Sequence, residues 1–330
     1  MRTKTPAPNE FPADLSSADR SVYSLWRRAF DDSDEQAACI ESLYPQRYHQ
    51  VGAGAFAGEV TTIDLDGVLL FRERINRRLI QEGSMNVLTI AWVPNRTGLF
   101  RSNGMDLEPE GAILYGEGAE FEVVCDPSDI TGVAISPEAL TRFPDTGTEP
   151  MPKVSRGLRS IPAAIATPLF ATVSRAFAAE DASRHPQPEG RDALRQKILT
   201  LVLAIAGLPD TADRKRCEHT YARVFDAAKR LMHSHLAHSL TIAQLCRQIG
   251  VSRRNLFYAF DAVLGISPYQ YLRTIRLNAV RRTLKRLPLG NGRIGDLAWE
   301  YGFSSPSQFA ADYKYRFGEL PSETVPRPAS

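Results

Sequence analysis

Residues 242–260 read IAQLCRQIGVSRRNLFYAF, and residues 294–313 read IGDLAWEYGFSSPSQFAADY. Both stretches place a leucine, a glycine and a serine in the same order, followed by aromatic residues at helical spacing. The offset between the copies is 52 residues at Gly250 and Gly302 and 53 residues at Phe260 and Tyr313. The chain therefore contains one short pattern twice, with one residue added in the second copy.

Each copy predicts a helix, a tight turn and a second helix. Glycine supplies the positive φ that ends the first helix, as expected at Gly250. Ser252 follows where a side-chain oxygen can accept from the free N–H groups of the next helix. In the second copy Ser305 precedes Pro306 and Gln308, which predicts a capping box with proline at the first helical position.

The joining segment begins with the same device, Ser267-Pro268-Tyr269-Gln270. It predicts a helix from Pro268 to Lys285, about 27 Å long at the usual rise per residue. A spacer of this length sets the two units near one turn of B-DNA apart, roughly 34 Å. The two second helices are therefore expected to enter successive major-groove segments on one face of a duplex.

Charge is divided along the chain in the same way. Residues 219–330 carry 16 Lys and Arg against 7 Asp and Glu, a net charge of +9, whereas the whole chain has +2. The first 218 residues are accordingly acidic, with a net charge of −7. A basic C-terminal part is what binding to DNA phosphates requires.

Residues 240–325 resemble the DNA-binding domain of the AraC/XylS transcription regulators. The matching positions are Ile242, Leu245, Gly250, Ser252, Leu256, Phe260, Gly265, Ser267, Pro268, Tyr271, Arg276, Ala279, Leu284, Ile294, Leu297, Ala298, Gly302, Phe303, Phe309, Tyr313, Phe317, Gly318 and Pro321. The resemblance implies a regulator that binds double-stranded DNA, with activation of transcription as one expected role, and that forms homodimers.

Candidate DNA contacts follow from the positions that the helix cores leave free. The base-reading candidates are Arg253, Arg254, Asn255, Phe257 and Tyr258 in the first unit and Pro306, Ser307, Gln308, Ala310 and Ala311 in the second. Arginine can bond guanine bidentately, so the first unit is expected to read more sequence than the second. The candidates for backbone contacts are Lys314, Arg273, Arg276, Arg281, Arg282 and Lys285.

Length and composition allow two ordinary domains, since the chain has 330 residues of which 43% are hydrophobic. We expect a tail with a short helix over 1–40, a cupin-like effector and dimerisation domain over 41–208, a linker over 209–218 and the DNA-binding domain over 219–325. The N-terminus is too polar for a signal peptide, and no apolar run reaches the roughly 18 residues of a membrane span. The sequence therefore predicts an α+β multidomain protein of the cytoplasm.

Within 41–208 the sequence predicts short strands and then helices. The expected strands are Gly54–Leu65, Val68–Ile75, Val87–Pro94, Ile113–Tyr115, Ala119–Val124 and Ile130–Ile135, separated by turn signals such as Asp66-Gly67. In AraC-like regulators the sensor is commonly a cupin-type jelly roll, and the resemblance implies the same here. Helices are expected over 161–180 and 191–208. The apolar stripe of the second helix packs either on the chain's own barrel or on a second subunit.

One basic cluster marks a possible effector site. Alternation along a strand places Arg72 and Arg74 on one face, where together with Arg78 they could hold an anionic small molecule. Arg74 and Arg78 also match the RxxxR half of the cyclic-dinucleotide motif of PilZ-type receptors, but the other half, [DN]xSxxG, is missing. A solvated, charged strand explains the same residues.

No metal site and no cofactor are expected. Before the linker the histidines are His49 and His185, too few for the histidine-rich centre of a cupin enzyme. The cysteines lack the CxxC spacing of a zinc knuckle. A cupin-like metalloenzyme with an accessory DNA-binding domain is therefore the second hypothesis, behind a regulator without catalysis.

Overall fold

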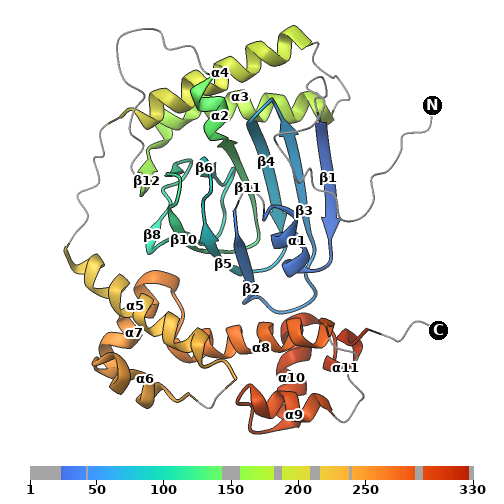
Figure 1. Cartoon of the computed structure of the whole chain (residues 1–330), viewed down its shortest axis with the longest axis vertical. Coiled ribbons are helices and arrows are strands. Elements are labelled where there is room, and N and C mark those ends of the chain that lie inside the picture. The colour runs from blue at the N-terminus through green and yellow to red at the C-terminus, as the bar shows by residue number, and fades with distance from the viewer. Residues whose placement is uncertain are drawn as a thin grey trace.

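The computed structural model of the chain describes residues 24–41, 44–142, 157–181, 188–208, 216–237, 240–286 and 293–326. Two packed β-sheets form an N-terminal β domain (residues 24–208), and a helical domain (residues 216–326) lies beneath it (Figure 1). None of the described helices combines the length and the apolar character that a membrane crossing requires.

The strands form two antiparallel sheets. The seven-stranded sheet has the order β1 (Ser24–Phe30), β3 (Gly58–Asp64), β4 (Val68–Ile75), β11 (Ser128–Ile135), β6 (Leu88–Trp92), β9 (Ala112–Tyr115) and β12 (Leu158–Ile161). The five-stranded sheet has the order β2 (Gln46–Gln50), β5 (Leu79–Ser84), β10 (Glu120–Cys125), β7 (Phe100–Ser102) and β8 (Met105–Asp106). Two short helices, α1 (Ser33–Cys39) and α2 (Pro137–Thr141), adjoin them.

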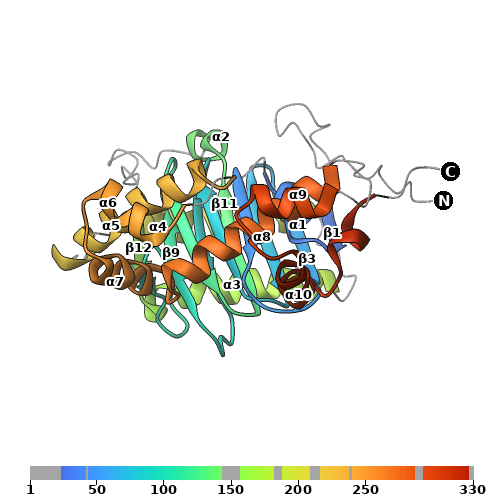
Figure 2. The ribbon, with the colours of Figure 1, turned by 90° about the horizontal axis from the view of Figure 1, so that it is seen from below.

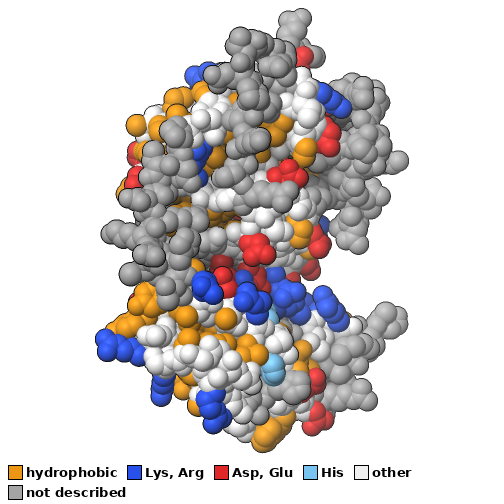
Figure 3. Space-filling view, turned by 60° about the vertical axis from the view of Figure 1, so that its left-hand side comes forward, with side chains coloured by type: hydrophobic (Ala, Val, Ile, Leu, Met, Phe, Trp, Pro, Cys, Tyr) orange, Lys and Arg blue, Asp and Glu red, His pale blue; other side chains and the backbone are white. Residues whose placement is uncertain are grey.

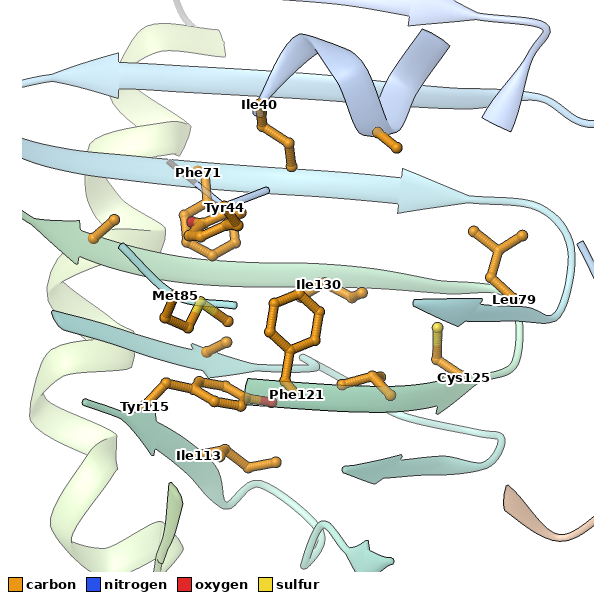
Figure 4. Packing of buried hydrophobic residues seen from close by; sticks show 14 of the residues in the cluster. Ile40, Tyr44, Phe71, Leu79, Met85, Ile113, Tyr115, Phe121, Cys125 and Ile130 are labelled. Carbon is orange, nitrogen blue, oxygen red and sulfur yellow. The ribbon is translucent and has the colours of Figure 1, made fainter. Parts of the chain in front are cut away.

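Alternation along the strands builds the core between the sheets. On β4, Phe71 and Ile75 point inward and join the buried cluster that Figure 4 shows, while Leu70 points outward. The hairpin from β3 to β4 turns at Asp66 and Gly67, with φ of 53° and 82°. Positive φ at both central residues is the geometry of a type I′ turn, which suits the twist of paired strands. The predicted β-rich N-terminal domain is therefore confirmed as a two-sheet structure.

Helices α3 (Ala163–Asp181) and α4 (Pro188–Ala206) cover the outer face of the seven-stranded sheet (Figure 1). The stripe predicted on α4 is buried there, with Ile198, Val202 and Ile205 in one cluster with residues of the sheet. The stripe thus packs on the chain's own sheet, and a subunit interface formed by these helices stays a prediction.

Several elements depart from the prediction. The segment expected as a tail with a short helix contains both β1 and α1, and β1 pairs with β3 along its whole length. Strands β2, β5, β7, β8 and β12 were not predicted. Residues 209–215 of the expected linker lie outside the described residues, and α5 (Arg216–Ser234) begins within its last part.

The helical domain contains the predicted pair of helix-turn-helix units. Its remaining elements are α6 (Ile242–Ile249), α7 (Arg253–Leu264), α8 (Pro268–Arg286), α9 (Arg293–Glu300), α10 (Pro306–Phe317) and α11 (Pro321–Thr324). Gly250 and Gly302 have φ of 70° and 79° at the two turns. Ser252 and Ser305 accept from the N–H groups of Asn255 and Gln308, as expected of capping residues.

The joining helix α8 is also as predicted, within one residue of its expected end. Ser267 and Gln270 form a capping box, since each side chain bonds the backbone N–H of the other residue. The second copy lacks the reciprocal bond, because the Gln308 amide donates to Asp312 instead, at 2.9 Å.

Candidate nucleic-acid interface

The second helices of the two units, α7 and α10, lie on the same side of α8 (Figure 2). Their first turns are exposed, with Arg253, Arg254 and Asn255 on α7 and the segment 306–308 on α10. Their last turns face the β domain. Each unit therefore presents the N-terminal end of its second helix, the end that enters the major groove in helix-turn-helix proteins.

The first turn of α7 holds two arginines beside aromatic rings. The Arg254 Nε donates to the Tyr258 hydroxyl at 3.1 Å, and its guanidinium lies 5.2 Å from that ring centre. Arg253 lies 5.4 Å from the ring centre of Phe257 and 5.7 Å from that of Tyr269. A positive charge at a helix N-terminus opposes the helix dipole. DNA would relieve this repulsion, so the arrangement favours an anionic partner.

Tyr269 was not among the predicted DNA contacts, because this residue lies at the start of α8 rather than on α7. Its side chain is 50% exposed and supports Arg253 from the neighbouring helix. Only the contact across the turn between α7 and α8 relates it to the base-reading residues.

Polar groups in the second unit are largely engaged with one another. Asp312 accepts from Gln308 and forms an ion pair with Arg273 of α8. Ser307 and Ala311 are exposed and Ala310 is half-buried. This first turn offers short side chains and an amide that is already bonded, so the expectation of a weaker sequence reader stays in place as a prediction.

The backbone-contact candidates fall into two groups. Lys314 is exposed on α10. Arg273 is half-exposed in its pair with Asp312, and Arg276 is half-buried beside Gly302. Burial lowers the pKa of Arg276, which is nonetheless charged at neutral pH. These three residues lie close to the two units.

The other group faces the β domain and is paired with acidic residues, so its phosphate contacts stay a prediction. Arg281 pairs with Asp32 and, at 3.1 Å, with Glu319, and Lys285 also pairs with Asp32. Arg282 pairs with Asp34 of α1 at 3.0 Å. This flank of α8 lies against β2 and α1.

The β domain also bonds the last turns of both second helices. The Arg101 guanidinium of β7 donates to the carbonyls of Asp261 at 2.9 Å and Ala262 at 3.3 Å, at the end of α7. The backbone N–H of Gly54 donates to the Tyr315 carbonyl of α10 at 3.0 Å. Donors at a helix C-terminus satisfy carbonyls that have no partner within the helix. Both units are therefore attached to the β domain.

The arginines expected to hold an anionic effector do not form one site. Arg72 lies over the Phe177 ring of α3, 4.4 Å from its centre. Arg74 lies on the same outer face, paired with Glu59 and Asp129 at 3.3 Å each. Alternation thus places these two residues correctly, but each has its own partner within the chain.

The third arginine of that set, Arg78, pairs with Asp126 at 2.5 Å. The interior charge on β4 is Glu73, a buried acid that accepts from Tyr48 and Gln36. Burial raises the pKa of Glu73. In this structure Arg72, Arg74 and Arg78 each have a separate partner, and an effector site at these residues stays a prediction.

Outside the DNA face, polar side chains gather where the five-stranded sheet meets α5. Acidic groups of the β domain face basic groups of the helices along this boundary (Figure 3). Lys229 pairs with Glu82 at 2.9 Å and with Glu122. Burial raises the pKa of Glu122 to about 7, although Lys229 lowers it.

Two histidines join this boundary, which corrects the expectation that the chain cannot assemble a metal-ligand set. His49, Glu82 and His233 approach one another on the outer face of the sheet, not in the interior where a cupin centre lies. Burial lowers the pKa of His49 and brings that of His233 to about 4, against the attraction of Glu82. Burial opposes ionisation of Glu82, but His49 and Lys229 hold its pKa well below the ordinary range.

Comparison with known proteins agrees with the helical geometry. A helix-turn-helix domain family matches residues 245–327. The probable thc operon regulatory protein of Rhodococcus erythropolis is 37% identical over 98 residues, which cover 29% of this chain and 30% of that protein. The XylDLEGF operon transcriptional activator 2 of Pseudomonas putida is 31% identical over 101 residues, which cover 31% of this chain and 64% of that protein.

Among solved structures, the AraC-like transcriptional activator CuxR aligns over 78% of this chain and 94% of its own, with a TM-score of 0.44 and 16% identity. The sequence matches fall on the part of the chain that contains α7 and α10. The chain spans less than two thirds of the length of the Rhodococcus and Pseudomonas relatives, and the similarity is confined to its C-terminal helix-turn-helix domain, which resembles that of the XylDLEGF operon transcriptional activator.

Proposed function

We propose that the chain is a sequence-specific transcription regulator that binds double-stranded DNA in the cytoplasm. The observation that carries the proposal is the pair of exposed first turns, on α7 and α10, on the same side of α8. A 19-residue helix between them is about 28 Å long, close to the pitch of B-DNA. Arg253 and Arg254 read bases in one half of the site, and Lys314 contacts the backbone.

The proposal includes control by a small-molecule effector and a homodimer as the active form. Contacts from the β domain to the last turns of α7 and α10 support control by an effector. A ligand that shifts the β domain also shifts the two helix-turn-helix units, because these contacts join them. The identity of the effector is left open. Light scattering of the purified chain with and without DNA tests the second part.

Selection of bound sequences from a random duplex pool, followed by gel shifts with the full chain, tests DNA recognition. We expect a recovered site of about two helical turns, bound well above a scrambled duplex of equal length. Equal binding of recovered and scrambled duplexes at every salt concentration would contradict sequence-specific recognition. The control variant is Lys197→Ala, which changes an exposed residue of α4 outside the two helix-turn-helix units. It should bind both duplexes as the wild-type chain does.

A further inference from the structure

Three side chains with metal-ligating atoms converge between the two domains. His49 comes from β2, Glu82 from β5 and His233 from α5, and one ligand atom of each lies within 4.8 Å of the others. Two ligands belong to the β domain and the third to the helical domain. Neither domain contributes the whole set.

Distances within the set are close to those of a coordination sphere. His49 Nε2 lies 3.0 Å from Glu82 Oε1, and His233 Nε2 lies 3.8 Å from Glu82 Oε2. Donor atoms bound to zinc lie about 2.0–2.2 Å from the ion, and hence roughly 3.3–3.5 Å from one another when the geometry is tetrahedral. One ligand atom of each residue lies within 4.8 Å of the others, so rotation of these side chains is needed to bring the three atoms around one ion.

The three side chains are largely buried. His49 is fully buried, and the side chains of Glu82 and His233 are 11% and 19% exposed. Within the described part of the chain, the His49 Nδ1 atom has no hydrogen-bond partner. The ring is thus held by Glu82 through one nitrogen and can turn toward an ion without breaking another bond.

The charge balance points the same way. Glu82 and Glu122 share the single charge of Lys229, so the two carboxylates leave one negative charge over when both are ionised. A buried, uncompensated charge is costly. A divalent ion held by Glu82 more than offsets this negative charge, and Lys229 then remains paired with Glu122.

We propose that His49, Glu82 and His233 form a binding site for a divalent first-row transition-metal ion of the zinc class, which ties the β domain to α5. Two imidazoles and one carboxylate suit zinc, whereas magnesium and calcium prefer oxygen ligands alone. Three protein ligands leave the fourth position to water. The ion replaces the Tyr271 hydroxyl, now 2.9 Å from His233 Nε2, as the partner of that nitrogen.

The test is a calorimetric titration of the metal-free full chain with Zn²⁺ alone. We expect one ion per chain. His233→Gln and Glu82→Gln should each weaken binding by more than the roughly 10–100-fold that loss of an outer partner of a ligand costs. The matched control is His235→Gln, two residues further along, whose Nδ1 contacts the Leu231 carbonyl and which should keep wild-type affinity. Tyr271→Phe should bind at least as tightly as wild type.

Cobalt substitution of the wild-type chain gives a readout that needs no variant. Visible absorption of tetrahedral Co²⁺ and shifted proton signals of two imidazoles are expected. Far-UV circular dichroism in metal-free buffer verifies that His233→Gln and Glu82→Gln are folded. Absence of Zn²⁺ binding by the wild-type chain, undiminished binding in both folded variants, or cobalt signals without imidazole protons would each overturn the proposal.

Discussion

Asn278 of α8 bonds the backbone of Gln50 in the way that a neighbouring strand would. Its side-chain oxygen accepts from the Gln50 N–H at 3.0 Å, and its amide donates to the Gln50 carbonyl at 3.2 Å. Gln50 ends β2, an edge strand whose outer backbone groups would otherwise lack sheet partners. The helical domain therefore completes the edge of the β domain.

We expect Asn278→Ala to lower the free energy of unfolding by about 1–3 kcal/mol, because it leaves two buried polar groups of Gln50 unpaired. Urea denaturation of the full chain measures this. Asn278→Asp, which keeps the acceptor and loses the donor, should also be destabilising. A change below about 0.5 kcal/mol for Asn278→Ala would mean that water takes over both bonds.

Base reading by α7 predicts an uneven loss of affinity. Arg254→Ala should cost about 1–3 kcal/mol against the preferred site and much less against sites altered at one base pair, which wild type already binds weakly. Ser307→Ala should weaken binding modestly and to a similar degree for all sites. The measurement is the affinity of each variant for a series of operators that each differ at one base pair. Equal losses of Arg254→Ala on every operator would identify the arginine as a backbone contact.

Salt dependence separates the two groups of basic residues. Lys314→Ala should reduce the slope of log affinity against log salt by about one phosphate contact. Arg282→Ala should leave that slope unchanged, because Arg282 is paired with Asp34 of the β domain. Gel shifts over a salt series measure both. A reduced slope for Arg282→Ala would show that the helical domain leaves the β domain when it binds DNA.

Glu73→Gln tests the buried carboxyl within the sheets. Burial raises the pKa of Glu73 in the folded chain, so the native state binds more protons than the unfolded state between the two pKa values. Stability that depends on this group is thus present at low pH and is lost as pH rises through that window. The variant should raise the denaturation midpoint at neutral pH, and its advantage should vanish below the unfolded pKa.

The control for that experiment is Glu117→Gln, in an exposed turn. Its denaturation midpoint at neutral pH should match that of the wild-type chain. If Glu73→Gln is destabilising at neutral pH, the bonds that Tyr48 and Gln36 donate to the carboxylate outweigh the cost of burying it.

The elements that were predicted correctly depend on interactions between residues close in sequence. The caps at Ser252 and Ser305 and the turn at Asp66-Gly67 depend on neighbouring residues alone, so the second helices and this hairpin were found. Strand β5 escaped notice because its polar Gln81 and Glu82 break the apolar pattern. Glu82 faces Lys229 of the helical domain, whereas Gln81 points inward, beside Glu73.

Contacts distant in sequence were beyond such signals. Gln50 and Asn278 are 228 residues apart, and His49 meets His233 only because β2 packs against α5 and α8. The basic flank of α8 likewise suggested phosphate contacts, because its acidic partners at Asp32 and Asp34 are remote in the chain. Charge alone does not tell a cation that meets DNA from one that meets another domain.

The bonds from Arg101 to the end of α7 and from Gly54 to the end of α10 bear on which operators the chain tolerates. One inserted base pair between half-sites turns the second half by about 34° around the duplex axis. A lone spacer helix can follow part of such a rotation by bending. Two units fastened at separate points to one β domain cannot follow it without breaking a contact, so operator spacing is fixed by the same bonds that fasten the domains.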